Sequence, residues 1–349
     1  MRPLLPFGAI ASSAALSRPV APLMLDSALV AGASWFAFTL VGSTYTNTAF
    51  LKAGGSATEL TLIRIAGSAV LGALLLGGAG EWLELMRTVQ KYASSFVLPA
   101  VCLFLANLCN SVALERCGIT LTYVTKAAGP VAAILLCFLG YGVLPTLNSL
   151  LAVPFVIGGV ALSIWSNTEF EKFGFLAACC STIFQTFLGL AGRNAMVKTG
   201  LSGEYAQLIS CALILSASAV QWAGSAAVRA VSGKPGGKPP GSQAATRAAL
   251  CNPRKLRKQL PARVGILSLN MLRLLCPLAF YLEYTLMFTF ASKVDSVTLS
   301  VSDTVRRAAI VYVGRVLFGG DALLPINKMG IFTALAGALL YTLLAVGPG

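Results

Sequence analysis

The chain of 349 residues contains no histidine and few acidic residues. The first absence excludes His-ligated metals, a histidine general base and a histidine proton relay. Aspartate and glutamate together number 12, and all charged residues make up 11% of the chain, whereas soluble domains have about 25%. A soluble protein of this length would need solvating charge that is absent here.

Cysteine is present nine times, without the spacing of a disulfide framework or a zinc site. Most of these cysteines fall inside apolar segments, which indicates small buried side chains. We also find no nucleophile–base arrangement and no metal cluster in the sequence. We therefore expect no enzyme, no catalytic residue, no metal and no cofactor.

Apolar residues make up 56% of the chain, and the mean hydropathy is +0.79. About 20 apolar residues are needed to cross a bilayer as a helix. This criterion predicts an all-α polytopic membrane protein with ten transmembrane helices. The predicted spans are residues 28–50, 60–79, 94–114, 118–142, 147–166, 173–195, 204–226, 265–290, 296–318 and 329–347.

Two segments differ from these spans. Residues 1–26 carry two arginines and no acid before Asp26, which fits either a loose N-terminal tail or an organellar targeting remnant. Residues 227–263 are rich in Gly, Pro and basic residues and contain no acid, which predicts a disordered basic loop. We interpret this loop as a topology determinant in preference to a site for nucleic acid or lipid, and we expect no nucleic-acid partner.

The sequence also repeats itself, which predicts two homologous halves, residues 27–168 and 169–349. "TAFLKAG" (48–54) resembles "NAMVKTG" (194–200) at an offset of 146 residues. This offset is 34 residues smaller than the offset of 180 found further along the chain, and 34 is close to the length of the basic loop. Five helices per half would give the halves opposite orientations, as in secondary transporters with a site where the halves meet. Four further positions match at an offset of 180 residues: Lys126, Phe138, Gly140 and Pro145 with Arg306, Phe318, Gly320 and Pro325.

Three cations fall well inside predicted spans: Lys126 in the fourth, and Arg306 and Arg307 in the ninth. A cation at the centre of a membrane helix costs about 2.5–3.5 kcal/mol, so each must face a polar cavity or a partner. The repeat places Lys126 and Arg306 at equivalent positions of the two halves, facing one central cavity. Arginine's planar fork and lysine's point charge suit a phosphate group, although nucleotide diphosphates and carboxylates also fit.

Internal ion pairing is the alternative explanation for these cations. Asp303, one turn before Arg307, and Glu283 in the eighth span could neutralise two of the three charges. Arg64 in the second span is a further buried cation, for which the sequence offers Glu59 as a weak partner.

Three motifs resemble the plastid triose-phosphate/phosphate translocator family of the drug/metabolite transporter superfamily. They are "TYVTKAAGP" (122–130), "GRNAMVK" (192–198) and "VTLSVSDTVRRAAIVYVGRVLFGG" (297–320). The resemblance covers most of residues 28–347. It implies ten helices and strict antiport of inorganic phosphate against phosphorylated metabolites of three to six carbons.

The resemblance also implies site residues. Lys126, Arg306 and Arg307 fall on the family's phosphate-binding positions, with Arg306 in place of a lysine. The family's substrate-contacting histidine falls on Asn107, and its tyrosine falls on Glu283 beside Tyr284. A glutamate of the family is replaced by Gly129, and we expect Asn110 to share the task of Asn107. The predicted substrate-binding residues are Lys126, Arg306, Arg307, Asn107, Asn110 and Tyr284.

The leading hypothesis is therefore a membrane antiporter that exchanges inorganic phosphate for a phosphorylated sugar or related organic phosphate. An empty site with three unpaired cations would reorient slowly, which would enforce one-for-one exchange. Two alternatives stay open: a nucleotide-sugar/nucleoside monophosphate antiporter of the Golgi or endoplasmic reticulum, and a membrane scaffold or receptor that does not transport. The positive-inside rule places the basic loop in a cytoplasm-like compartment, which favours a plastid envelope over the Golgi.

Overall fold

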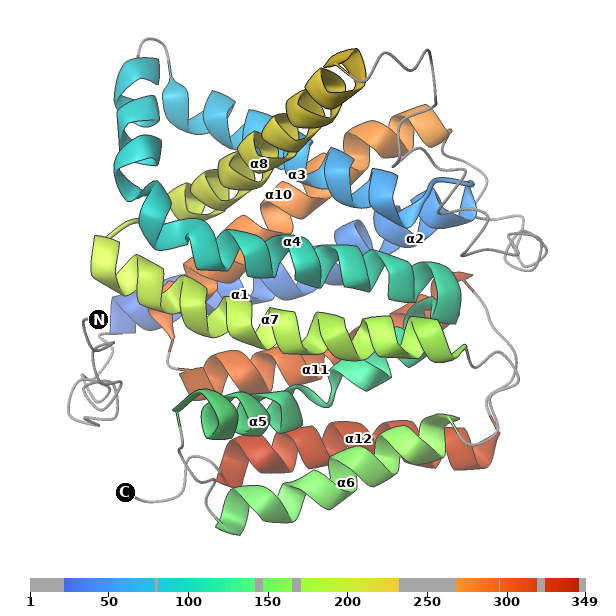
Figure 1. The fold of residues 1–349 in the computed structure, drawn as a ribbon. Helices are drawn as coiled ribbons and strands as arrows, with labels where there is room; N and C mark the ends of the chain where they lie inside the picture. The colour runs from blue at the N-terminus through green and yellow to red at the C-terminus, as the bar shows by residue number, and fades with distance from the viewer. Residues whose placement is uncertain are drawn as a thin grey trace.

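The computed structural model describes residues 22–78, 81–141, 147–164, 171–231, 268–294, 296–318 and 324–344. Every regular element within these ranges is a helix (Figure 1). The helices in chain order are α1 (Pro22–Phe38), η3 (Thr39–Ser43), α2 (Thr44–Lys52), α3 (Ala57–Gly77), α4 (Trp82–Lys126), α5 (Gly129–Tyr141), α6 (Leu147–Ile164), α7 (Lys172–Thr199), α8 (Gly203–Val231), α10 (Leu269–Lys293), α11 (Ser296–Phe318) and α12 (Pro325–Leu344).

Each of the ten predicted spans overlaps at least one helix. Within the described ranges, four helices are long and apolar enough to cross a membrane: α3, α4, α7 and α10. Shorter apolar stretches lie at Leu29–Phe38 and Leu150–Ser163. The chain is therefore an all-α protein with several membrane-spanning helices, and ten crossings in two inverted halves stay a prediction.

Two predicted boundaries differ from the helices. Helix α1 begins at Pro22, inside the tail predicted at residues 1–26. Helix α8 continues to Val231, so residues 227–231 of the predicted basic loop are helical. Residues 1–21 and 232–267, which hold the rest of the tail and of the loop, lie outside the described part of the chain.

Helix α4 bends sharply at Gly118, where φ is +70° and ψ is −177°. This backbone conformation is open to glycine and strained for other residues. The bend separates the predicted third and fourth spans. Immediately before it, Arg116 pairs with Glu171 of the segment that leads into α7, at 2.6 Å, and Glu115 accepts a hydrogen bond from the first residue of α3.

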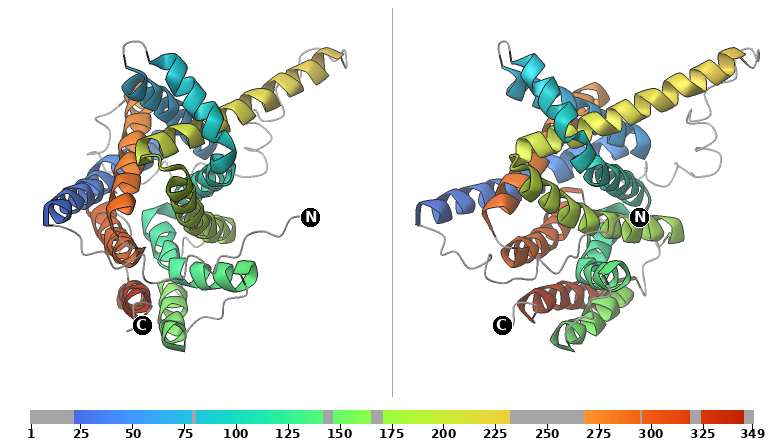
Figure 2. Two further views of the ribbon diagram at one scale, coloured as in Figure 1. Left: turned by 90° about the vertical axis from the view of Figure 1, so that its left-hand side faces the viewer. Right: turned by 60° about the vertical axis from the view of Figure 1, so that its left-hand side comes forward.

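Helix pairs from distant parts of the chain form the body of the protein. Helix α4 packs along α7, α1 along α10, α3 against α8, and α6 along α12. The α6–α12 pair lies side by side in every view (Figures 1 and 2). These two helices approach closely because glycine faces the neighbouring backbone: a Cβ at Gly159 would lie 2.2 Å from the Ala334 nitrogen.

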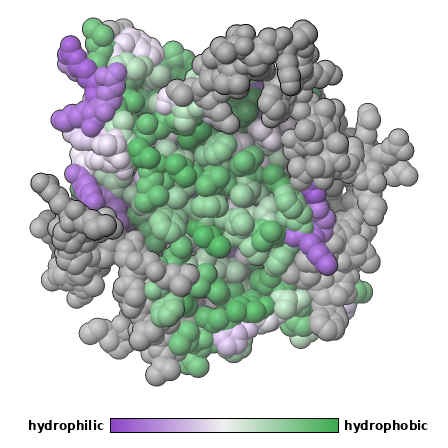
Figure 3. All heavy atoms as spheres, viewed as in Figure 1, coloured by the Kyte–Doolittle hydropathy of each residue, from purple (hydrophilic) through white to green (hydrophobic). Residues whose placement is uncertain are grey.

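The surface of the helical body is largely apolar. Figure 3 shows apolar side chains across the middle of one face, with hydrophilic side chains near its left and right margins. Large side chains such as Leu75, Leu83 and Phe332 are more than two-thirds exposed, at 67%, 73% and 75%. In water this exposure would be costly, so lipid chains are the natural surroundings of these side chains.

Candidate functional site

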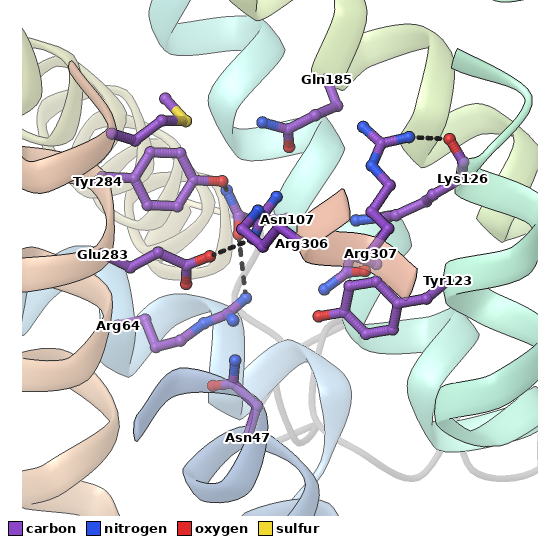
Figure 4. Close-up of a pocket in the computed structure, with 12 residues that line it drawn as sticks. Asn47, Arg64, Asn107, Tyr123, Lys126, Gln185, Glu283, Tyr284, Arg306 and Arg307 are labelled. Atoms are coloured by element: carbon purple, nitrogen blue, oxygen red, sulfur yellow. Dashed lines mark hydrogen bonds and ion pairs between the residues drawn. The ribbon is translucent and has the colours of Figure 1, made fainter. Parts of the chain in front are cut away.

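A polar pocket lies between the helices, near the break between α4 and α5 (Figure 4). Six helices supply its walls, and all six residues predicted from sequence to bind substrate line it. The lining residues are Asn47, Arg64, Asn107, Asn110, Tyr123, Lys126, Gln185, Glu283, Tyr284, Met287, Arg306 and Arg307.

Lys126 ends α4 at one side of the pocket. Ala127 and Ala128 form a turn between this helix end and the start of α5 at Gly129. The Lys126 ammonium lies over the Tyr123 ring, 5.4 Å from its centroid, and its side chain is buried. No carboxylate within the described ranges forms an ion pair with it.

The interrupted helix end also binds an arginine through its backbone. Nη1 of Arg307, from α11, donates a hydrogen bond to the Lys126 carbonyl. Such a contact satisfies a carbonyl that has no partner within its helix. A Cβ at Gly129 would lie 3.2 Å from Nη1, so the missing side chain at this position leaves room for the guanidinium.

Both site arginines have carboxylate partners inside the protein. The Asp303 carboxylate accepts from Arg306, with Nε at 3.1 Å, and also pairs with Arg307. Arg306 additionally faces Glu283 at 3.4 Å, and Ser43 donates to that same carboxylate. The internal pairing considered as the alternative is therefore present for the two arginines, and the expectation of three unpaired cations is wrong.

Arg64 is the buried cation that the predicted site left out. It comes from α3, and only 2% of it is exposed. Its Nη2 donates to the neutral oxygens of Asn107 at 3.3 Å and Ser111 at 3.1 Å. The partner suggested by sequence is wrong, because Glu59 pairs instead with Arg273 at 2.8 Å.

The charges of the site do not cancel. Four cations, Arg64, Lys126, Arg306 and Arg307, share two carboxylates, those of Glu283 and Asp303. The formal excess is two positive charges in a buried space. Since isolated buried charge is costly, this arrangement favours an anionic guest.

Amides and a phenol form the rest of the polar wall. Asn107 donates through Nδ2 to the Tyr284 hydroxyl at 3.0 Å and accepts from Arg64, so it joins α3 to α10. The Tyr284 hydroxyl keeps its own hydrogen to donate. The side-chain oxygens of Asn47 and Asn110 are buried and have no hydrogen-bond partner among the described atoms.

Several lining residues were absent from the predicted site. The sequence did carry a signal for three of them: Arg64 and Gln185 are polar residues inside apolar spans, and Tyr123 lies three residues before Lys126. Asn47 carried the same signal, since it is a polar residue inside the predicted span 28–50, whereas Met287 carried none. Glu283 was foreseen only as an ion-pair partner, and it also lines the pocket.

Comparison with known proteins gives the family. The profile of the Triose-phosphate Transporter family matches residues 27–342. The chain belongs to this family. Its members are transporters, so this family member is a transporter and not an enzyme.

Curated relatives of this triose-phosphate transporter are plant proteins of moderate similarity. The phosphoenolpyruvate/phosphate translocator 1, chloroplastic, of Arabidopsis thaliana is 26% identical over 318 residues, which cover 89% of this chain and 70% of the relative. The triose phosphate/phosphate translocator, non-green plastid, chloroplastic, of Brassica oleracea var. botrytis is 25% identical over 313 residues, 89% of this chain and 71% of the relative. Together with the membrane-spanning helices, these relatives identify an integral multi-pass protein of an organellar membrane.

Proposed function

We propose that this transporter exchanges inorganic phosphate for a phosphorylated sugar or a related organic phosphate by alternating access. One observation carries the proposal: Lys126, Arg306 and Arg307 converge on one buried pocket, although Lys126 and Arg307 are 181 residues apart in the chain. They hold more positive charge than the acids around them neutralise. Phosphate oxygens accept several charge-assisted hydrogen bonds at once, which this cluster can donate.

Unsatisfied donors support an anion at this place. The Nε–H of Arg307 has no hydrogen-bond acceptor among the described residues, although it is buried. The Lys126 ammonium has three N–H groups, lies over the Tyr123 ring and forms no ion pair with any described residue. A phosphate group between these two side chains would satisfy both.

The helix pairing supports two inverted halves. If the halves are related by a two-fold axis, the first span (α1) corresponds to the sixth (α7), and the third span (α4) corresponds to the eighth (α10). The contact of α1 with α10 then has its counterpart in the contact of α4 with α7. The pairs α3–α8 and α6–α12 map onto themselves. This is the pairing expected when the substrate site lies where the halves meet.

Exchange would follow from the charge of the empty site. Without an anion, closing the halves around the pocket would bury Lys126 and Arg64 with no carboxylate beside them. A bound phosphate group offsets that cost, so loaded carriers reorient faster than empty ones. In this explanation two cations without a carboxylate partner, Lys126 and Arg64, slow the reorientation of the empty carrier, instead of the three that the sequence predicted.

The relatives also bear on cargo and location. Both named relatives are phosphate translocators of chloroplasts, and neither name mentions a nucleotide sugar. The Golgi alternative is therefore not favoured. We assign the protein to a plastid envelope, with inorganic phosphate and a phosphorylated metabolite as its small-molecule partners and lipid as its surroundings.

The decisive experiment measures uptake of labelled phosphate into proteoliposomes with and without internal phosphate. It uses the full-length protein, Arg306→Gln and a matched control, Arg273→Gln. Arg273 is a partly exposed arginine on α10 whose ion pair with Glu59 lies outside the pocket. Uptake should require internal phosphate, persist in the control and fall at least tenfold in Arg306→Gln.

Two results would overturn the proposal. One is the absence of phosphate exchange by well-folded protein, in which case the same vesicles should be loaded with nucleoside monophosphate and tested with nucleotide sugars. The other is net uptake into phosphate-free vesicles as fast as exchange, which would identify a uniporter.

A further inference from the structure

The helix that begins at Pro22 contains one turn of π-helix. Helix α1 continues through η3 into α2 without a break, because the residues on both sides of η3 keep helical backbone angles. At the end of this turn the Thr44 N–H donates to the Thr39 carbonyl, five residues back instead of four. Single π turns inside α-helices are rare and frequently lie at functional sites.

Hydroxyl groups support the π turn locally. The Thr44 hydroxyl donates to the same Thr39 carbonyl at 2.8 Å, and the Thr39 hydroxyl donates to the Trp35 carbonyl at 2.7 Å. Threonine hydroxyls also donate to the carbonyl four residues back in an ordinary α-helix. The local sequence therefore stabilises the π turn and would equally tolerate an α-helix in its place.

The π turn brings two side chains onto one face of the helix. Trp35 and Ser43 are eight residues apart, which in a continuous α-helix would place them about 80° apart around the axis. A π turn contains more residues than an α turn, which reduces this angle. Both side chains contact α10: the Trp35 ring lies 5.8 Å from the Phe290 ring, and Ser43 donates to the Glu283 carboxylate.

These two side chains both act on Arg306. The Trp35 ring lies 4.7 Å from the guanidinium carbon, and Ser43 acts through Glu283, which pairs with Arg306 at 3.4 Å. Trp35 is buried, and its Nε1–H has no acceptor among the described residues. An unsatisfied buried donor costs free energy that another position of the ring could relieve.

We propose that the π turn η3 is a switch that couples anion binding at Arg306 to rotation of α1. This inference rests on the proposed function and adds Trp35 and Ser43 as positioning residues. A phosphate group that engages Arg306 weakens its contacts with Glu283 and Trp35. The π turn then loses the contacts that maintain it and relaxes to the commoner α form.

Relaxation of the π turn would move α1 against its neighbour. It would rotate α1 by about 80° relative to α2 and withdraw Trp35 from Arg306. Because α1 packs along α10, this rotation changes a contact between helices of the two proposed halves. An empty pocket leaves Arg306 in contact with Trp35 and Glu283, so α1 stays in place until an anion binds.

Fluorescence of Trp35 tests the rotation directly. The chain has four tryptophans, so replacing Trp82, Trp165 and Trp222 by phenylalanine leaves Trp35 as the single emitter. Detergent-solubilised full-length protein is titrated with inorganic phosphate, and thermal unfolding measures phosphate binding in parallel. The emission should change saturably, with its midpoint at the phosphate Kd. Phosphate binding without a change in emission overturns this inference alone, whereas the absence of phosphate binding refutes the proposed function as well.

Removal of Gly42 separates the switch from the positions of its side chains. Gly42 lies in η3 and has no side chain to lose. Its removal leaves Trp35 and Ser43 seven residues apart, within about 20° of each other in an α-helix. The variant should bind phosphate within about threefold of the native Kd, without the change in emission. Its phosphate exchange in proteoliposomes should fall by about tenfold or more, and exchange at the native rate overturns the inference.

Two substitutions of Ser43 maintain the test if the deletion variant does not fold. Ser43→Ala removes the donor to Glu283 and should lower the maximal rate of exchange more than it changes the KM for phosphate. Ser43→Thr keeps the hydroxyl and should retain most of the native rate. Ser216→Ala is the matched control, since that exposed hydroxyl donates to the Leu213 carbonyl of its own helix. Equal rates for Ser43→Ala, Ser43→Thr and the native chain would overturn the coupling through Ser43.

Discussion

If phosphate binds to Arg306 and Arg307 as proposed, Asp303 competes with it, because its carboxylate pairs with both arginines. Phosphate must displace this carboxylate or share the arginines with it. Replacing it by asparagine keeps the size of the side chain and removes the competing charge. We therefore expect Asp303→Asn to bind phosphate more tightly than the native chain does.

The contacts set the magnitude of this change. A hydrogen bond to a charged group is worth about 1.5–3 kcal/mol net. If phosphate binding in the native chain costs one such contact to Asp303, the substitution should lower the Kd for phosphate by about 10- to 100-fold. The empty variant should also lose about 3–5 kcal/mol of unfolding free energy, because Arg307 is left without a carboxylate.

Thermal unfolding of the detergent-solubilised protein against phosphate concentration measures both effects. A ligand that binds only the folded state adds RT ln(1 + [L]/Kd) to the free energy of unfolding. Because the variant binds phosphate more tightly, saturating phosphate should reduce the difference in unfolding free energy between the variant and the native protein. Glu171→Gln is the matched control: it breaks an ion pair with Arg116 outside the pocket and should leave the phosphate dependence unchanged. An unchanged or weaker phosphate affinity in Asp303→Asn would refute competition and make Asp303 a positioning residue for the arginines.

Two glycine substitutions test the fold. Gly118→Ala should lower the unfolding free energy by about 1–3 kcal/mol through backbone strain alone, since a Cβ there meets nothing within 4 Å. Gly159→Ala should cost about 1–3 kcal/mol by overpacking α6 against α12, where the Cβ would meet the Ala334 backbone. Gly158→Ala is the control for both, because its site is open and helical, and thermal unfolding should find it neutral or slightly stabilised. Equal stability of all three variants would contradict the helix packing described above.

The sequence predicted the site best where charged residues lie inside apolar spans. Lys126, Arg306 and Arg307 stand out inside apolar spans, and the internal repeat relates Lys126 to Arg306 by position alone. The structure brings all three to one pocket. Asp303 lies one helical turn from Arg307, so its pairing could also be anticipated from spacing.

Ion pairs between residues on different helices could not be predicted in this way. Glu59 is five residues from Arg64, yet it pairs with Arg273, 214 residues away in the chain. That choice depends on how α3 packs against α10, which spacing along one helix does not contain. The bend at Gly118 was hidden for another reason: the chain has 34 glycines, and only backbone geometry shows which of them takes a positive φ inside a helix.

The internal carboxylates also bear on how the proposed exchange would be enforced. In the native chain Asp303 and Glu283 lower the cost of closing an empty pocket, because they neutralise part of its charge. Asp303→Asn removes one of the neutralising charges, so the empty variant should reorient more slowly relative to the loaded variant. The ratio of net efflux to phosphate exchange in proteoliposomes should therefore fall below the native ratio. A rise in that ratio would mean that the unpaired charge of the empty site does not hold the carrier back, and that steric closure around the cargo enforces exchange instead.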